Sequence, residues 1–142
     1  MSYQKTSCIQ IPSDPTALGS LLTWFNQFQD SPIPYRLWLQ CQLALAEGFT
    51  NAVRHAHAHL PATTLIAIEI VVSDRTIDMR IWDQGPGFDF SKVLANQDCH
   101  CDRSAEKGRG LIILSRVADQ LSYHTYSGKG NCLHLHKAYG DS

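Results

Sequence analysis

Within the stretch EGFTNAVRHAH, a carboxylate, an amide and an imidazole recur every four residues, as Glu47, Asn51 and His55. In a helix, each step of four turns the position by only about 40° and rises about 6 Å, so the three side chains form one stripe. Polar groups of these kinds are costly to bury without partners on a helix that is otherwise apolar. The stripe is therefore either part of a site for chemistry or the solvent-facing side of the helix.

The stretch WDQGPGFDF places Asp83 at the end of a predicted strand, followed by Gly85 and Gly87 in the spacing D-x-G-x-G. A carboxylate there can accept a hydrogen bond from an exocyclic amine, and glycine lets the backbone approach a flat ligand or take a positive φ. Aspartate, glycine and proline are also the usual residues of turns, so the segment taken alone is consistent with a plain turn.

A third stretch, EKGRGLIIL, places Gly108 and Gly110 at the start of a predicted helix. Free N–H groups at a helix start, together with the positive end of the helix dipole, form an anion site, and Lys107 and Arg109 add positive charge. The alternative is an ordinary glycine-rich loop with a basic first helical turn. Neither a G-x-x-x-x-G-K-[ST] loop nor a dinucleotide-binding fingerprint is present.

These three stretches need elements to position them, and the hydrophobic pattern predicts a series of strands and helices. Strands are predicted at residues 5–11, 65–73, 76–83, 121–126 and 131–137. Helices are predicted before Pro32, at 35–58 and at 108–121. Residues 88–107 are polar and irregular, and a connection of this length in a compact domain is often functional. Strands joined as hairpins, with helices collected on one face, indicate an α+β two-layer sandwich.

The composition limits the class of protein. The 142 residues, 44% of them hydrophobic, suit a single domain with a normal core. The formal net charge is −1 and no cluster of Lys or Arg occurs, which argues against nucleic acid as the main partner. No apolar run is long enough to span a membrane, and the N-terminal residues lack the apolar core of a signal peptide. A cytoplasmic location is therefore expected.

His57, His59 and the cysteines are predicted to be structural or exposed. His57 and His59 are expected on the surface near a helix end, where a positive charge suits the dipole. Three cysteines lie in apolar-patterned segments and are predicted to be buried: Cys8, Cys41 and Cys132. Three further residues are predicted to form an exposed loop rather than a zinc site, because a fourth ligand is missing: Cys99, His100 and Cys101.

Taken together, the three stretches resemble the GHKL ATPase superfamily, which includes gyrase, MutL, the large heat-shock chaperone and the histidine kinases. ExxxNxxxH on a helix, D-x-G-x-G after a strand and G-x-G-L at a helix start follow its order and approximate spacing. The chain most resembles the small anti-sigma-factor serine/threonine kinases, and the likeness covers nearly its whole length. It implies a Bergerat-type ATP-binding fold over residues 1–142, with a mixed, mostly antiparallel sheet and helices on one face.

The resemblance also implies a role for each matching residue. Asn51 would coordinate the Mg²⁺ that bridges the ATP phosphates, and Glu47 would be the general base for an attacking hydroxyl. Asp83 would bind the adenine amino group, while Gly85 and Gly87 would let the base and ribose approach. The residues that would surround the phosphates are Lys107, Gly108, Arg109, Gly110 and Leu111. Residues 90–107 would form the ATP lid, and His55 would have a structural role.

The activity implied is that of an ATP-dependent protein serine/threonine kinase that also regulates a partner by binding it. It would bind a sigma factor or similar target and phosphorylate a Ser or Thr of a small antagonist protein. The first 33 residues are too short for the phospho-accepting helical hairpin of a histidine kinase. Two alternatives stay open: a nucleotide-binding module without catalysis, and a stand-alone histidine-kinase catalytic domain acting in trans. Because relatives often dimerise, a homodimer is a further expectation.

Overall fold

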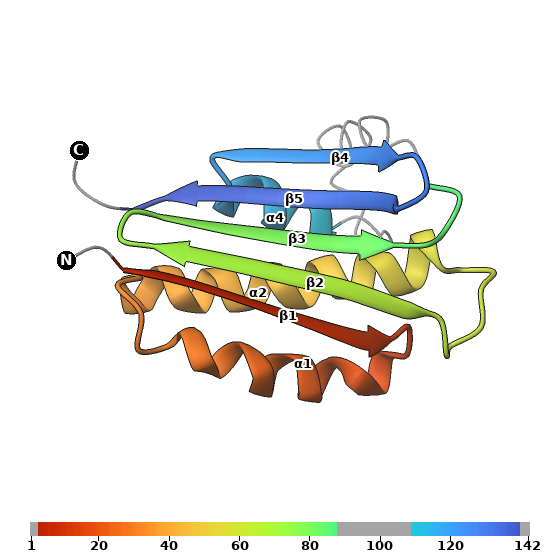
Figure 1. Ribbon diagram of the computed structural model, residues 1–142, viewed down its shortest axis with the longest axis horizontal. Coiled ribbons are helices and arrows are strands. Elements are labelled where there is room, and N and C mark those ends of the chain that lie inside the picture. Colours follow the sequence, from red (N-terminus) through yellow and green to blue (C-terminus); the bar gives the residue numbers. More distant parts are fainter. Residues whose placement is uncertain (1–2, 88–108, 140–142) are drawn as a thin grey trace.

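One five-stranded sheet organises the chain in the computed structural model, which describes residues 3–87 and 109–139 (Figure 1). The strands are β1 (Gln4–Pro12), β2 (Leu65–Ser73), β3 (Thr76–Asp83), β4 (Gln120–Tyr126) and β5 (Gly130–Ala138). Their order across the sheet is β1-β2-β3-β5-β4, and each of the four pairings is antiparallel. The central strand β3 therefore joins the β2–β3 hairpin to the β4–β5 hairpin.

The helices cover one face of this sheet, and α2 and α4 pass behind it in Figure 1. They are α1 (Leu18–Phe25), α2 (Tyr35–Asn51) and α4 (Arg109–Val117). Short 3₁₀-helices flank α1, namely η1 (Pro15–Ala17) and η2 (Asn26–Phe28), and a π-helix, η3 (Ala52–Ala56), continues α2. None of the described helices combines the length and the apolar character needed to cross a bilayer.

The core forms where the alternating strands meet the apolar stripes of the helices. In β2 every second side chain is buried, and in α2 the buried positions recur at three- and four-residue spacing. Phe25 of α1 stacks on Trp38 of α2 with ring centroids 5.4 Å apart. Each large apolar side chain buried in this way contributes about 1.5–3 kcal/mol. The helical layer is thereby fixed against the face of the sheet that carries Ile77, Met79 and Ile81.

The predicted fold class is confirmed, with some differences in detail. The strands predicted at 65–73 and 76–83 have the observed bounds. The sheet is antiparallel at every described pairing rather than mixed. The α-helix predicted at 35–58 ends at Asn51 and continues as η3, and the last helix ends at Val117 rather than residue 121. The predicted lid, 90–107, lies outside the described residues, as do Cys99, His100 and Cys101.

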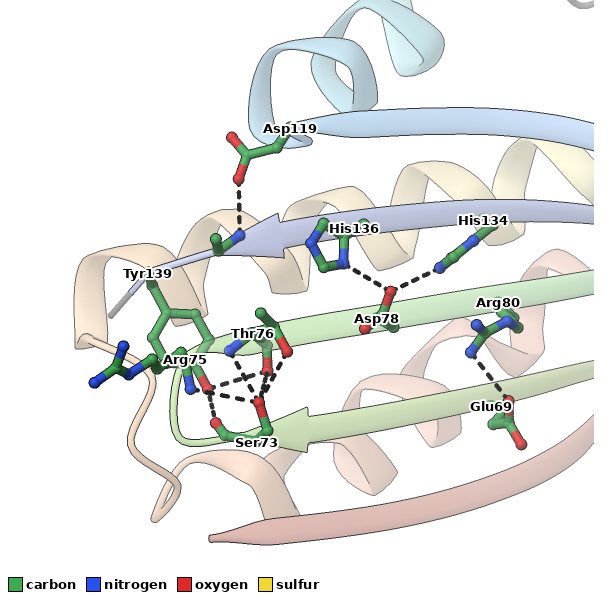
Figure 2. A network of polar contacts seen from close by, with 11 residues as sticks. Glu69, Ser73, Arg75, Thr76, Asp78, Arg80, Asp119, His134, His136 and Tyr139 are labelled. Carbon is green, nitrogen blue, oxygen red and sulfur yellow. Dashed lines mark hydrogen bonds and ion pairs between the residues drawn. The ribbon is translucent and has the colours of Figure 1, made fainter. Parts of the chain in front are cut away.

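The opposite face of the sheet carries polar side chains that pair across strands (Figure 2). The carboxylate Oδ1 of Asp78 in β3 lies 2.7 Å from His134 Nε2 and 2.9 Å from His136 Nδ1, both in β5. Glu69 of β2 forms an ion pair with Arg80 of β3 at 3.4 Å. This face therefore has a different character from the apolar face that meets the helices.

Candidate functional site

The carboxylate of Asp83 is buried at the end of β3, with 3% of its surface exposed. Its Oδ1 accepts hydrogen bonds from the Gly85 backbone N–H at 3.0 Å and from Asn131 Nδ2 at 2.7 Å. Its Oδ2 accepts one from the Tyr123 hydroxyl at 2.8 Å. These bonds fix the orientation of the group, and burial together with the bond to Asp83 raises the pKa of the Tyr123 hydroxyl.

The three hydrogen bonds leave Asp83 with capacity for a ligand. An ionised carboxylate offers about four acceptor positions. In the described part of the chain, two donors occupy Oδ1 and one occupies Oδ2. Asp83 alternates with the core side chains of β3, so it lies on the helical face of the sheet. Among the described residues, one acceptor position on Oδ2 therefore has no donor.

The backbone after Asp83 is packed closely enough that Gly85 cannot be replaced without a shift. A Cβ at Gly85 would lie 1.8 Å from the carbonyl oxygen of Ala56 in η3. Gly87 has φ +84°, a conformation that side chains other than glycine rarely adopt. Each glycine of D-x-G-x-G is thus required for a different structural reason. The first makes a close contact, and the second adopts a left-handed backbone conformation.

Helix α2 approaches β3 closely at Gly48, which lies between two residues of the predicted stripe. A Cβ at Gly48 would lie 2.4 Å from the side-chain Cδ1 of Ile81. The Gly48 contact and the Ala56–Gly85 contact therefore bracket the last turn of α2 and η3 along the end of β3. Asn51 lies within this segment and is 8% exposed, whereas Glu47 is partly exposed. Among the described residues, no side-chain hydrogen bond engages either of them.

The π-helix η3 changes the end of the predicted stripe. His55 lies inside η3 and is partly buried, so it does not continue the α-helical spacing of Glu47 and Asn51. The prediction that His57 lies on the surface is wrong, because its side chain is only 3% exposed. The wider π turn ends at His57 and directs it toward the segment after β3, where its Nε2 contacts the Gln84 backbone N–H. His59 is exposed, as predicted.

The predicted phosphate segment is described only in part. Helix α4 begins at Arg109, so Arg109, Gly110 and Leu111 form its first turn, and α4 packs beside α2. Lys107 and Gly108 lie outside the described residues. In the described ranges, no group of three or more His, Cys, Asp or Glu side chains is arranged to hold a metal ion.

Two residues of the site were missed by the sequence analysis, and both come from the C-terminal hairpin. Tyr123 of β4 and Asn131 of β5 donate to Asp83, and Asn131 Nδ2 also donates to the Gly85 carbonyl at 2.9 Å. A signal existed for Asn131, because it alternates with the buried residues Leu133 and Leu135 and so occupies an inward position. A polar residue there needs a partner. Tyr123 offered no comparable signal.

The cysteine predictions are confirmed for two residues and wrong for the third. Cys41 and Cys132 are buried, and burial raises the pKa of their thiols to about 12 and about 11 respectively. Cys8 is exposed, because β1 turns it toward the polar face of the sheet.

A hollow of about 440 Å³ opens beside the polar face of the sheet, lined by residues that include Gln10, Trp82 and Lys129. Glu47 and Asn51 do not line it.

The sequence of residues 11–137 matches the family of the histidine kinase-like ATPase domain, and the chain belongs to this family. The superfamily inferred from the three motifs is thereby confirmed.

Over part of its length the chain is similar to serine-protein kinases named RsbW. The protein of Staphylococcus epidermidis is 28% identical over 92 residues, which are 61% of this chain and 58% of the relative. The protein of Staphylococcus aureus strain MRSA252 is 27% identical over 92 residues, with the same shares. The chain thus spans less than two thirds of the length of these curated relatives.

Proposed function

We propose that this chain is an ATP-dependent protein serine/threonine kinase of the anti-sigma-factor type. It regulates a target protein, such as a sigma factor, by binding it and by phosphorylating a small antagonist protein in the cytoplasm. The observation that carries the proposal is the buried carboxylate of Asp83, which has an acceptor position that no described donor uses and lies beside glycine backbone. Its strand, β3, is approached closely at Ile81 by the helix that bears Glu47 and Asn51. The family membership and the serine-kinase relatives support it.

Asp83 suits recognition of a purine base. Its position is fixed by three donors, and its remaining lone pair accepts a hydrogen bond from an exocyclic amine. Gly85 and Gly87 present backbone without side chains next to it. A flat adenine ring fits against such a surface, and its amino group supplies the donor that Asp83 lacks.

The phosphates and their cation are assigned to the elements on either side of the base. Asn51 is a buried amide without a described side-chain partner, so its oxygen is available as a ligand for Mg²⁺. Bound Mg²⁺ would neutralise charge on the phosphate oxygens. The N–H groups at the start of α4, with Lys107, Gly108, Arg109, Gly110 and Leu111, suit the phosphates because a helix start favours anions.

Glu47 is proposed as the general base. The hydroxyl oxygen of the acceptor Ser or Thr forms a bond to the γ-phosphorus, the bond from that phosphorus to the bridging oxygen breaks, and ADP leaves. The hydroxyl proton passes to the Glu47 carboxylate. Glu47 is partly exposed one helical turn before Asn51, so a hydroxyl from another protein can reach it.

Calorimetry with ATP and ADP in the presence of Mg²⁺ tests the nucleotide site. Wild-type protein is expected to bind, and Asp83→Asn to lose about 1–3 kcal/mol of binding free energy, because its amide offers the adenine amine a donor or a weaker acceptor. Asp78→Asn is the matched control, since Asp78 lies on the same strand but on the opposite face. If the wild-type protein did not bind nucleotide, or if Asp83→Asn bound it equally well, the proposed nucleotide site would be wrong.

Incubation with γ-labelled ATP and a candidate antagonist protein then tests the reaction. Acid-stable label on the antagonist is expected for phosphoserine or phosphothreonine. Acid-labile label would indicate a histidine-kinase catalytic domain acting in trans. Binding of ATP without transfer to any candidate antagonist would indicate a regulatory module that lacks catalysis.

A further inference from the structure

One ring nitrogen of His57 is bound to the turn after Asp83, and the other has no partner within residues 3–87 and 109–139. Its side chain is 3% exposed, and Nε2 accepts the backbone N–H of Gln84 at 2.7 Å. Nδ1 is buried, with no hydrogen-bond partner among the described residues. Buried polar atoms are normally paired, so this arrangement calls for a reason.

The hydrogen bond to Gln84 determines the protonation state of the ring. A backbone N–H can only donate, so Nε2 must carry a lone pair. The single proton of the neutral ring is therefore on Nδ1. A second proton would have to enter at Nε2, where it would point at the Gln84 N–H and abolish the bond.

The residue that His57 binds lies between two parts of the candidate site. Gln84 follows the carboxylate of Asp83 and precedes Gly85, whose backbone N–H donates to Asp83 and whose Cα abuts the Ala56 carbonyl. The turn is thus attached to the end of η3 at two adjacent residues, by packing at Gly85 and by a hydrogen bond at Gln84. Loss of the hydrogen bond would remove the Gln84 attachment to η3, while Asn131 would still hold Asp83 and the Gly85 carbonyl.

We propose that His57 is a positioning residue of the nucleotide site, and that its neutral ring fixes the Asp83–Gly85 turn against η3 in the arrangement that binds the base. This inference rests on the proposed nucleotide-binding function. His57 acts through the Gln84 backbone and need not touch the nucleotide.

The proposal makes nucleotide affinity sensitive to protonation of one residue. Burial lowers the pKa of His57, and the negative charge of Asp83 opposes this only in part. The ring is therefore neutral near pH 7, and it becomes charged only at a pH below the ordinary histidine pKa of about 6.5. Of the other titratable groups on its own segment, Arg54 and His59 are exposed and His55 is partly buried.

The test compares ATP affinity from pH 7.5 to 5.0 in wild-type protein, His57→Gln and His57→Phe. The Gln side chain can place an acceptor near the position of Nε2 and does not titrate, whereas Phe keeps the ring without an acceptor. Titration of the ATP phosphates and of other histidines is common to all three proteins and cancels in the ratios. The wild-type affinity relative to His57→Gln is expected to fall about tenfold per pH unit below the folded pKa. His57→Phe is expected to bind weakly throughout.

The amide resonance of Gln84, followed by NMR in nucleotide-free protein, gives a second measurement that does not depend on ATP. It should titrate together with the His57 ring in wild-type protein and not in His57→Gln. If the ratio of wild-type to His57→Gln affinity does not change with pH in a protein that binds ATP, the role of His57 is overturned but the proposed function is not. Absence of ATP binding at every pH overturns the proposed function, and this role with it, whatever the Gln84 amide does.

Discussion

Asp83 and Glu47 are both carboxylates of the candidate site, but their surroundings suit them to different tasks. Asp83 is buried and held by three donors from the described residues, which suits the proposed recognition of a base. Glu47 is partly exposed, and in the described part of the chain no hydrogen bond or ion pair restrains its side chain. A general base must reach a hydroxyl that arrives with a second protein, so freedom to move is useful there.

The Glu47→Gln substitution tests this division of roles. Glutamine has nearly the same shape but cannot take the proton, so phosphoryl transfer to the antagonist is expected to fall by about 10²- to 10⁴-fold. ATP affinity should change little, because Asp83 and the backbone around it are untouched. Glu69→Gln on the polar face is the matched control and should leave both quantities unchanged. The measurements are single-turnover transfer and calorimetry; a transfer rate unaffected by Glu47→Gln would exclude the proposed base.

At the scale of elements, the sequence predicts what depends on local pattern. The strands 65–73 and 76–83 were predicted to the residue because Ile, Val and Met alternate and a short turn separates them. The π-helix after Asn51 was not predicted, because its residues, AVRHA, are compatible with a continued α-helix. Its position is tied to tertiary contacts at Gly85 and Gln84. The burial of His57 was missed for the same reason.

The residues of the candidate site likewise divide into those that the local sequence predicts and those that depend on tertiary contacts. The positions of Asp83, Gly85 and Asn51 could be singled out because acids, amides and glycines in these spacings are informative on their own. The contributions of Tyr123 and Asn131 could not, since they depend on which strands become neighbours in the sheet. The β3–β5 pairing places Asn131 opposite Asp83, although 48 positions separate them in sequence.

Helix α2 lies close to β3 at Gly48. A double-mutant cycle can measure the energetic coupling between Gly48 and the side chain of Ile81. Ile81→Val removes the Cδ1 atom that a Cβ at residue 48 would meet at 2.4 Å. In the wild-type background this substitution is expected to cost about 0.5–1.5 kcal/mol of unfolding free energy. In the Gly48→Ala background it should cost less, because it also relieves the contact, which gives a coupling of at least about 0.5 kcal/mol.

Urea denaturation of the four proteins of this cycle measures the coupling. Ile33→Val provides the control. Ile33 is buried and lies just before the start of α2, roughly 20 Å along the helix axis from Gly48. Its effect should add to that of Gly48→Ala without coupling. If Gly48→Ala and Ile81→Val were also strictly additive, the spacing of helix and sheet would not depend on this contact.

At the scale of the whole molecule, the polar face of the sheet connects segments that lie far apart in the chain. Asp78 belongs to the β2–β3 hairpin, and its partners His134 and His136 belong to the β4–β5 hairpin (Figure 2). Burial alone would raise the pKa of the Asp78 carboxyl, but hydrogen bonds and charge attraction from His136 and His134 outweigh it and lower the pKa. The ionised form is therefore stabilised in the folded state.

A lowered folded pKa fixes the pH range in which Asp78 stabilises the protein. The contribution is complete above the unfolded value of about 3.9 and is lost as the pH falls through the folded pKa. Asp78→Asn is expected to reduce the unfolding free energy by about 1 kcal/mol at pH 7, with a smaller difference at pH 3.5, as measured by urea denaturation. Asp30→Asn is the control, since Asp30 is exposed and no described side chain pairs with it. A difference between Asp78→Asn and wild-type protein that stayed constant from pH 7 to 3.5 would mean that the charge of Asp78 does not join the two hairpins, and that backbone pairing and core packing do so alone.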